Sequence, residues 1–239
     1  MKKTISVTPI KTKIFHRGDD IYTFLKESLS GENLEGRVIA ITSKIISLAE
    51  KMTISKSEIS KNKLVKAESD KYIGPGGFGA ELTIKHGILI PSAGIDESNA
   101  EENGYILYPK NPYESAHKIW KFLREEFKLK NCAVILTDSH TMPLRRGVMG
   151  ISLAHWGFKA TRSLIGHPDI FGRELKFTHV DVVDSLASMA VFIMGEADDC
   201  TPLALILGAD LEYSEKTSSE EIKIEPENDL YFPLLKNFI

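Results

Sequence analysis

The 239-residue sequence contains only two cysteines, Cys132 and Cys200, and no hydrophobic run long enough to cross a bilayer. The spacing of the cysteines matches no zinc motif, so we expect two reduced thiols. The first residues alternate in hydropathy and do not form the continuous apolar core of a signal peptide. These absences favour a soluble, cytoplasmic protein with no membrane partner.

The chain also lacks a basic block. Its formal net charge is −3, which gives no electrostatic reason to expect binding to nucleic acid or to anionic membranes. With 42% hydrophobic and 26% charged residues, it has enough apolar side chains to bury a substantial core. We expect a single domain over residues 1–239, with a smaller subdomain within 75–155.

No glycine-rich nucleotide motif occurs in a suitable context. Residues 74–79 match the G-x-G-x-x-G spacing, but they lead into a strand-like segment and not into the helix that would receive a pyrophosphate. The G-x-x-x-x-G-K-[ST] motif is absent. We therefore interpret 74–79 as a flexible loop, and any nucleotide must be held by another architecture.

Hydrophobic periodicity predicts an α+β chain. Strand patterns cover 4–10, 37–42, 82–90, 132–136, 149–155, 175–183 and 202–208, and helical patterns begin at 19 and cover 43–50, 112–128 and 184–194. The clearest helix is 112–128, because Asn111 can cap it and Pro112 suits its first position. The polar segment 51–72 predicts an exposed connection with some helix, and the apolar segment 230–239 is expected to dock back onto the body.

Two acidic loops, 93–99 and 137–147, each follow a predicted strand. Asp96 in the first loop and Asp138 in the second should therefore emerge beside a cleft. Hard oxygen ligands from two loops, followed by a pair of arginines, are what a divalent metal and a polyphosphate need together. The combination favours nucleotide chemistry.

Six short blocks follow the order and approximate spacing of the coenzyme F-420:L-glutamate ligase family, which the chain resembles from about residue 5 to 208. The blocks are Gly18-Asp19-Asp20, Thr42-Ser43-Lys44-Ile45-Ile46-Ser47, Ala93 to Asn99, Thr137-Asp138-Ser139, Phe171-Gly172-Arg173-Glu174-Leu175 and Met194-Gly195-Glu196. Residues 143–147 and 155–159 resemble the branch often described as γ-glutamate ligases of folate metabolism.

The resemblance implies an enzyme that uses GTP, or else ATP, and Mg or Mn to join L-glutamate to an acceptor carboxylate. The amide would form through an acyl phosphate, and the acceptor would be a folate-like (pterin) or F-420-like (deazaflavin) compound. The implied fold is a composite mixed-sheet α+β fold in an intertwined homodimer. The number of glutamates added is not implied.

The resemblance also implies roles for single residues. Metal ligands would be Asp96, Asp138, Ser139 and Glu196, where Ser139 replaces a threonine but keeps its hydroxyl oxygen. Nucleotide contacts would be Thr12, Lys13, Ile14, Phe15, Ser43, Lys44, Asn99, Met194, Gly195 and Glu196. One position departs from the family, because Leu48 stands where a second nucleotide-binding lysine is common.

Three residues of the second loop are candidate catalytic groups. We assign Arg145 and Arg146 to clamping phosphate or the glutamate carboxylates, because a guanidinium makes bidentate contacts. His140 is a candidate base for the incoming amine, because its reference pKa lies near working pH. The simpler alternatives are solvated or ion-paired arginines and an ordinary loop histidine.

Two alternative functions use the same residues. The carboxylates would also serve a metal-dependent phosphohydrolase that activates water, or the chain could be a nonenzymatic GTP-binding protein descended from a ligase. The aromatic cluster His155, Trp156 and Phe158 suits either a stacking platform for an acceptor ring or core packing.

Overall fold

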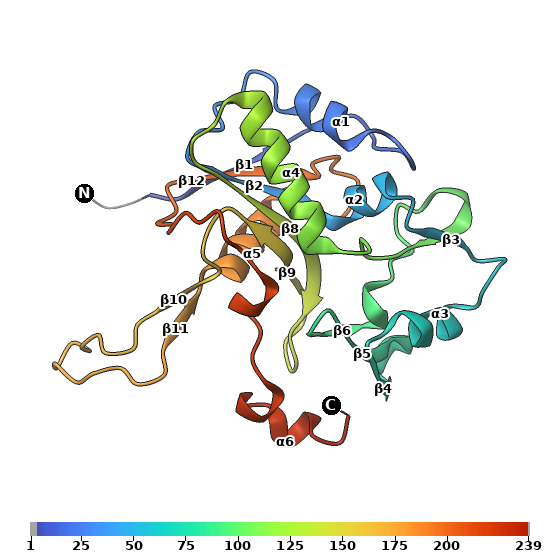
Figure 1. Cartoon of the computed structure of the whole chain (residues 1–239). Coiled ribbons are helices and arrows are strands. Elements are labelled where there is room, and N and C mark those ends of the chain that lie inside the picture. Colours follow the sequence, from blue (N-terminus) through green and yellow to red (C-terminus); the bar gives the residue numbers. More distant parts are fainter. Residues whose placement is uncertain (1–3, 239) are drawn as a thin grey trace.

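The computed structural model describes residues 4–238 and is centred on a five-stranded mixed sheet (Figure 1). The strands are β1 (Ser6–Ile10), β2 (Arg37–Thr42), β8 (Cys132–Thr141), β9 (Val148–Trp156) and β12 (Leu203–Leu207). Their order is β1-β12-β2-β8-β9, in which only β2 and β8 are parallel neighbours. The predicted α+β class is confirmed.

Helices cover both faces of this sheet. They are α1 (Ile21–Ser28), α2 (Ser43–Ala49), α4 (Pro112–Phe127) and α5 (Val182–Met194). Successive side chains of a strand point to opposite faces, so Ile39 and Ile41 of β2 join the core under α1, α2 and α4. Val38 and Ala40 join the core under α5. Burial on both faces explains why 38–41 of β2 and 132–136 of β8 are apolar without interruption.

A smaller lobe lies beside the sheet (Figure 1). Its elements are β3 (Thr53–Ser55), α3 (Lys61–Glu68), β4 (Lys71–Pro75), η1 (Gly77–Gly79), β5 (Glu81–Lys85), β6 (Ile88–Pro91), η2 (Ser92–Gly94), η3 (Glu101–Asn103) and β7 (Gly104–Ile106). Strands β4, β5 and β6 form one antiparallel sheet, and β3 pairs with β7. The 75–155 region therefore includes part of this lobe and then α4, β8 and β9 of the main sheet.

One expectation for this lobe is confirmed in part and another is wrong. The helix expected within 51–72 is present as α3, but the segment is more than a connection, because it also forms β3 and the start of β4, and α3 buries Leu64 and Val65. The single strand expected over 82–90 is two strands, because His86 and Gly87 both adopt positive φ and reverse the chain. Residues 74–79 span the end of β4 and the one-turn η1, and they lead into β5 and not into a helix that could receive a pyrophosphate.

The long helix is confirmed together with its cap. Helix α4 begins at Pro112, and the Asn111 side chain accepts the Glu114 N–H at 3.2 Å. It ends where Lys128 adopts a left-handed conformation with φ of 55°. Among residues 4–238 no helix is both long and apolar enough to span a membrane.

A two-stranded arm projects from the body, formed by β10 (Thr161–Ser163) and β11 (His179–Asp181) (Figure 1). The strand expected over 175–183 is therefore limited to 179–181, and α5 already begins at Val182. The C-terminal region contains η4 (Ser219–Glu221), η5 (Pro226–Asn228) and α6 (Phe232–Leu235). Leu230 and Leu234 are exposed there, so the expectation that this segment docks onto the body is wrong for its described residues.

The aromatic cluster at 155–158 packs in the core. His155 and Phe158 are fully buried with ring centroids 5.1 Å apart, and Trp156 stacks on His117 with centroids 4.1 Å apart. The Tyr113 hydroxyl lies 3.2 Å from His155 Nδ1. These contacts favour core packing over an acceptor platform.

We expect His155 to destabilise the fold in mild acid. Burial lowers the pKa of His155 to about 4, against an ordinary value of 6.5. Between those values the unfolded chain takes up a proton that the folded chain does not, so stability falls as pH falls. The loss is at most about 3 kcal/mol.

The His155→Gln variant lacks this titration, so its stability should change less than that of wild type between pH 7 and pH 4.5. Urea unfolding at both pH values measures the two changes. Equal changes in the two proteins would contradict the prediction.

Candidate active site

A cavity of about 560 Å³ opens at the edge where the parallel strands β2 and β8 end. Its walls come from the loop after β1, the start of α2, the segment from β6 to Asn99, the end of β8 and the segment that follows α5. The carboxyl ends of parallel strands are where α/β folds bind ligands. The cavity is therefore the first candidate for a substrate site.

Most of the residues assigned from sequence meet in this cavity. Those lining it are Thr12, Lys13, Ile14, Phe15, Lys44, Asp96, Asn99, Asp138, Ser139, His140, Met194, Gly195 and Glu196. Ser43 is buried beside Lys44 and is not among the lining residues. Arg145 and Arg146 are exposed in the turn between β8 and β9, outside the lining.

The Asp96 carboxylate contacts the Lys44 ammonium and accepts hydrogen bonds from Ser98, two residues further along the chain. Lys44 Nζ lies 2.7 Å from Asp96 Oδ2, and the Ser98 N–H and hydroxyl donate to Asp96 Oδ1 at 2.7 and 2.8 Å. Burial alone would raise the pKa of Asp96, but Lys44 and Ser98 together hold that pKa below its ordinary value. Asp96 is therefore a carboxylate at neutral pH.

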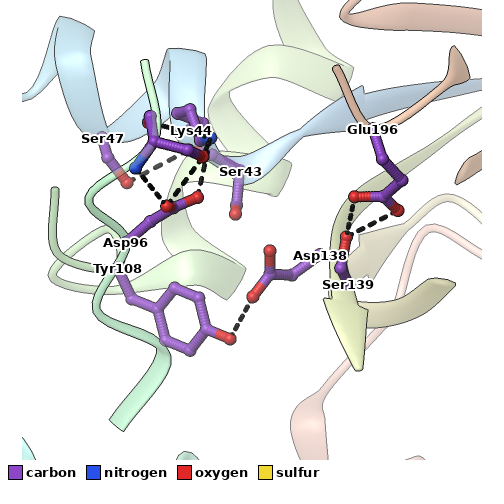
Figure 2. Close-up of polar contacts among 9 residues, drawn as sticks. Ser43, Lys44, Ser47, Asp96, Tyr108, Asp138, Ser139 and Glu196 are labelled. Carbon is purple, nitrogen blue, oxygen red and sulfur yellow. Dashed lines mark hydrogen bonds and ion pairs between the residues drawn. The ribbon is translucent and has the colours of Figure 1, made fainter. Parts of the chain in front are cut away.

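Asp138 lies opposite Asp96 and contacts a buried tyrosine. The Tyr108 hydroxyl donates to Asp138 Oδ2, and Figure 2 shows the other Asp138 oxygen directed away from that hydroxyl. Burial raises the pKa of Asp138 to about 6. Burial and the neighbouring Asp138 raise the pKa of Tyr108 well above its ordinary value, so the phenol keeps its proton and is the donor.

Ser139 links the sheet to the segment after α5. Its Oγ lies 2.8 and 2.7 Å from the two carboxylate oxygens of Glu196, to either of which the hydroxyl can donate (Figure 2). This contact brings Glu196, which lies two residues beyond the last residue of α5, Met194, against β8.

The prediction of a loop over 137–147 is wrong for its first residues. Asp138, Ser139 and His140 belong to β8 and pair with β9, so only 142–147 connects the two strands. The pairing register shifts between Leu136 and Thr137. Such bulges re-aim side chains next to functional sites, and this one immediately precedes Asp138 and Ser139.

His140 remains a candidate base. It lines the cavity, its Nδ1 has no hydrogen-bond partner within residues 4–238, and burial lowers its pKa. The imidazole is thus neutral and able to accept a proton at neutral pH. Arg145 and Arg146 lie at the end of the hairpin, and no contact in the described structure brings them to the carboxylates.

The donor set suits a hard divalent cation. Asp96, Asp138, Ser139 and Glu196 offer only oxygen atoms, as Mg²⁺ and Mn²⁺ prefer. Within the described residues no three His, Cys, Asp or Glu side chains converge into a ready-made cluster. Asp96 and Glu196 would therefore have to exchange their partners Lys44 and Ser139 to hold an ion.

Sequence reasoning missed Tyr108. It follows β7 in a run of six buried residues, Gly104 to Pro109, and no motif marks it. The one available signal was physical: a buried tyrosine hydroxyl needs a hydrogen-bond partner. The partner itself lies 30 positions further along the chain and cannot be identified from local pattern.

The chain was compared with known proteins. A family model described as F420-0:Gamma-glutamyl ligase matches residues 9–208. The coenzyme F420:L-glutamate ligase of Methanocaldococcus jannaschii is 32% identical, covering 95% of this chain and 97% of that protein. The protein of the same name from Methanopyrus kandleri is 34% identical, covering 85% and 86%. That from Archaeoglobus fulgidus is 30% identical, covering 97% and 98%.

Proposed function

Because the chain belongs to the F420-0:gamma-glutamyl ligase family, we propose that it is a carbon–nitrogen ligase that joins L-glutamate to the carboxylate of an F420-type acceptor. We propose GTP as the activating nucleotide, Mg²⁺ or Mn²⁺ as the cofactor and the cytoplasm as the location. One observation supports the chemistry: Asp96, Asp138, Glu196 and Lys44 line one cavity, in which the Lys44 ammonium contacts Asp96.

The reaction requires two bond exchanges. An acceptor carboxylate oxygen attacks the γ-phosphorus of GTP, the bond from that phosphorus to the β–γ bridging oxygen breaks, and GDP leaves with the electron pair. The glutamate amine then attacks the acyl carbon, phosphate leaves, and the nitrogen loses one proton. Both steps develop negative charge on oxygen, so the site must supply positive charge and exclude water.

A bound divalent cation would neutralise phosphate charge and align the reacting oxygens. Asp96, Asp138, Ser139 and Glu196 are the residues that would hold it. The chain itself contributes the Lys44 ammonium to the cavity, and we assign the uptake of the amine proton to His140, which also lines the cavity.

Leu48 makes one wall of this site apolar and uncharged. It lines the cavity and is 5% exposed, so an apolar side chain occupies the position where a second lysine is common in the family. Phosphate contacts must then depend more heavily on Lys44. The leucine also makes that wall of the cavity apolar, which helps to exclude water.

The F420-type acceptor is preferred over a folate for a specific reason. The relatives that match this chain over most of its length are named for coenzyme F420.

Mass spectrometry tests the proposal directly. Purified protein is incubated with Mg²⁺ or Mn²⁺, GTP or ATP, glutamate, and either the unglutamylated F420 precursor or a reduced folate. Glutamyl addition to the F420 precursor is expected, and addition to folate alone would replace the proposed acceptor. Phosphate release at full rate without glutamate or acceptor would identify a phosphohydrolase, and GTP binding without any turnover would identify a binding protein.

We also propose a homodimer in which the β10–β11 arm contacts the second copy. Phe171 and Phe177 lie in the segment that connects β10 to β11 and are 76% and 87% exposed, and Ile165 and Ile170 of the same segment are also exposed. Apolar side chains gathered on a projecting arm mark an interaction surface.

Replacing both Phe171 and Phe177 with aspartate is expected to convert the dimer to a monomer, because carboxylates would be buried without partners at the interface. Light scattering after size-exclusion chromatography measures the mass. Phe192→Asp, which changes an equally exposed phenylalanine on α5, should leave the dimer intact. A dimeric double variant would contradict the arm interface.

A further inference from the structure

Tyr108 is confined between the small lobe and the main sheet. Its side chain is 6% exposed and packs in a cluster with Ile90 of β6 and Leu153 of β9. Backbone at Gly94 lies against the ring, because a Cβ added there would be 2.1 Å from the ring Cζ. Gly94 also has φ of +71°, a conformation that favours glycine. The ring therefore has little freedom to turn.

The hydroxyl of this confined ring contacts the cavity at one point, Asp138. Tyr108 donates to Asp138 Oδ2, and Figure 2 shows the second carboxylate oxygen on the side away from Tyr108. A carboxylate with one oxygen fixed by a rigid donor keeps its other oxygen in a constant direction. Removing a partner that orients a metal ligand in this way typically lowers metal affinity about 10- to 100-fold.

We propose that Tyr108 is a positioning residue for Asp138: the hydrogen bond from its hydroxyl, with Gly94 holding the ring, orients the carboxylate so that one oxygen faces the bound cation and nucleotide. This inference rests on the proposed function, in which Asp138 is a metal ligand. Tyr108 itself touches neither the reacting atoms nor the nucleotide.

The Tyr108→Phe variant tests the inference, because it removes only the hydroxyl. Binding of Mn²⁺ to purified protein is followed by electron paramagnetic resonance, with and without GDP, and the thermal unfolding midpoint is measured in parallel. We expect Mn²⁺ affinity to fall about 10- to 100-fold. Affinity for GDP without metal should stay unchanged, and raising the Mn²⁺ concentration should restore most of the turnover.

Tyr105→Phe is the matched control. Tyr105 is also 6% exposed, lies in β7 and packs in the core of the small lobe, outside the cavity lining. It should bind Mn²⁺ as wild type does. If both variants shift the unfolding midpoint alike and neither changes Mn²⁺ affinity, Tyr108 has a packing role alone and the inference is overturned.

The same titration separates this inference from the proposed function. Loss of Mn²⁺ binding in Asp138→Ala with unchanged binding in Tyr108→Phe would overturn the role of Tyr108 and leave the metal site standing. A wild-type protein that binds no Mn²⁺ in either condition would overturn both.

Discussion

Replacing Asp138 with alanine is expected to lower turnover about 1,000-fold, because the change removes a proposed charged oxygen ligand from the cavity lining. The protein should remain folded. Loss of the partner of the Tyr108 hydroxyl costs about 1–3 kcal/mol. Removal of a carboxylate whose pKa burial has raised from 3.8 to about 6 returns about 3 kcal/mol at neutral pH. The two effects nearly cancel.

Turnover is measured as acceptor-dependent GDP release, and folding by the unfolding midpoint. Asp229→Ala is the control, because Asp229 caps a turn in the C-terminal segment and is not among the cavity-lining residues. A rate near that of wild type in Asp138→Ala would contradict the assignment of Asp138 as a ligand. A collapsed midpoint would instead show that Asp138 is needed for the fold.

The placement of Asp138 beside a cavity was predictable from sequence for a physical reason. A strand buried on both faces must be apolar throughout, so the run from Cys132 to Leu136 identified β8. The first polar residues after such a run emerge at the edge of the sheet. Lys44 lies just beyond β2, the parallel neighbour of β8, but its role was implied by the family resemblance and not by this logic.

The small lobe was harder to predict because its signals are short. Strands β3 and β7 have three residues each, and α3 presents two buried residues among lysines. Periodicity needs a longer window than these elements provide. The contact between Tyr108 and Asp138 crosses from this lobe to the main sheet, so no local pattern encodes it.

Arg145 and Arg146 show how chain proximity misleads. They follow Asp138 closely in sequence, which suggested a shared site. However, β8 continues as extended strand to Thr141, and each strand residue advances the chain by about 3.3 Å. The arginines are therefore carried about 10 Å or more beyond the carboxylate, to the exposed end of the hairpin. The continuation of β8 as a strand therefore keeps Arg145 and Arg146 away from Asp138, whereas a loop directly after Leu136 could have folded them back towards it.

Replacing Lys44 with alanine is expected to weaken nucleotide binding about 10- to 100-fold, because each hydrogen bond from a charged group contributes about 1.5–3 kcal/mol. Lys44 is the residue whose ammonium contacts Asp96 and Ser98 across the cavity. Its side chain is 23% exposed, and Asp96 is 39% exposed. Water can therefore solvate Asp96 in the variant, and stability should fall by no more than about 1 kcal/mol.

Isothermal titration with GDP and with GTP measures the effect, and Lys118→Ala is the control because Lys118 pairs with Glu114 on the surface of α4. Unchanged affinity for both nucleotides in Lys44→Ala would contradict the proposed contact. Comparing GDP with GTP also shows which phosphate group Lys44 contacts. An equal loss for GDP and GTP indicates that Lys44 binds the α- or β-phosphate, whereas a loss confined to GTP indicates the γ-phosphate. In the second case Lys44 would also stabilise the transferred group, and turnover at saturating GTP should fall with affinity.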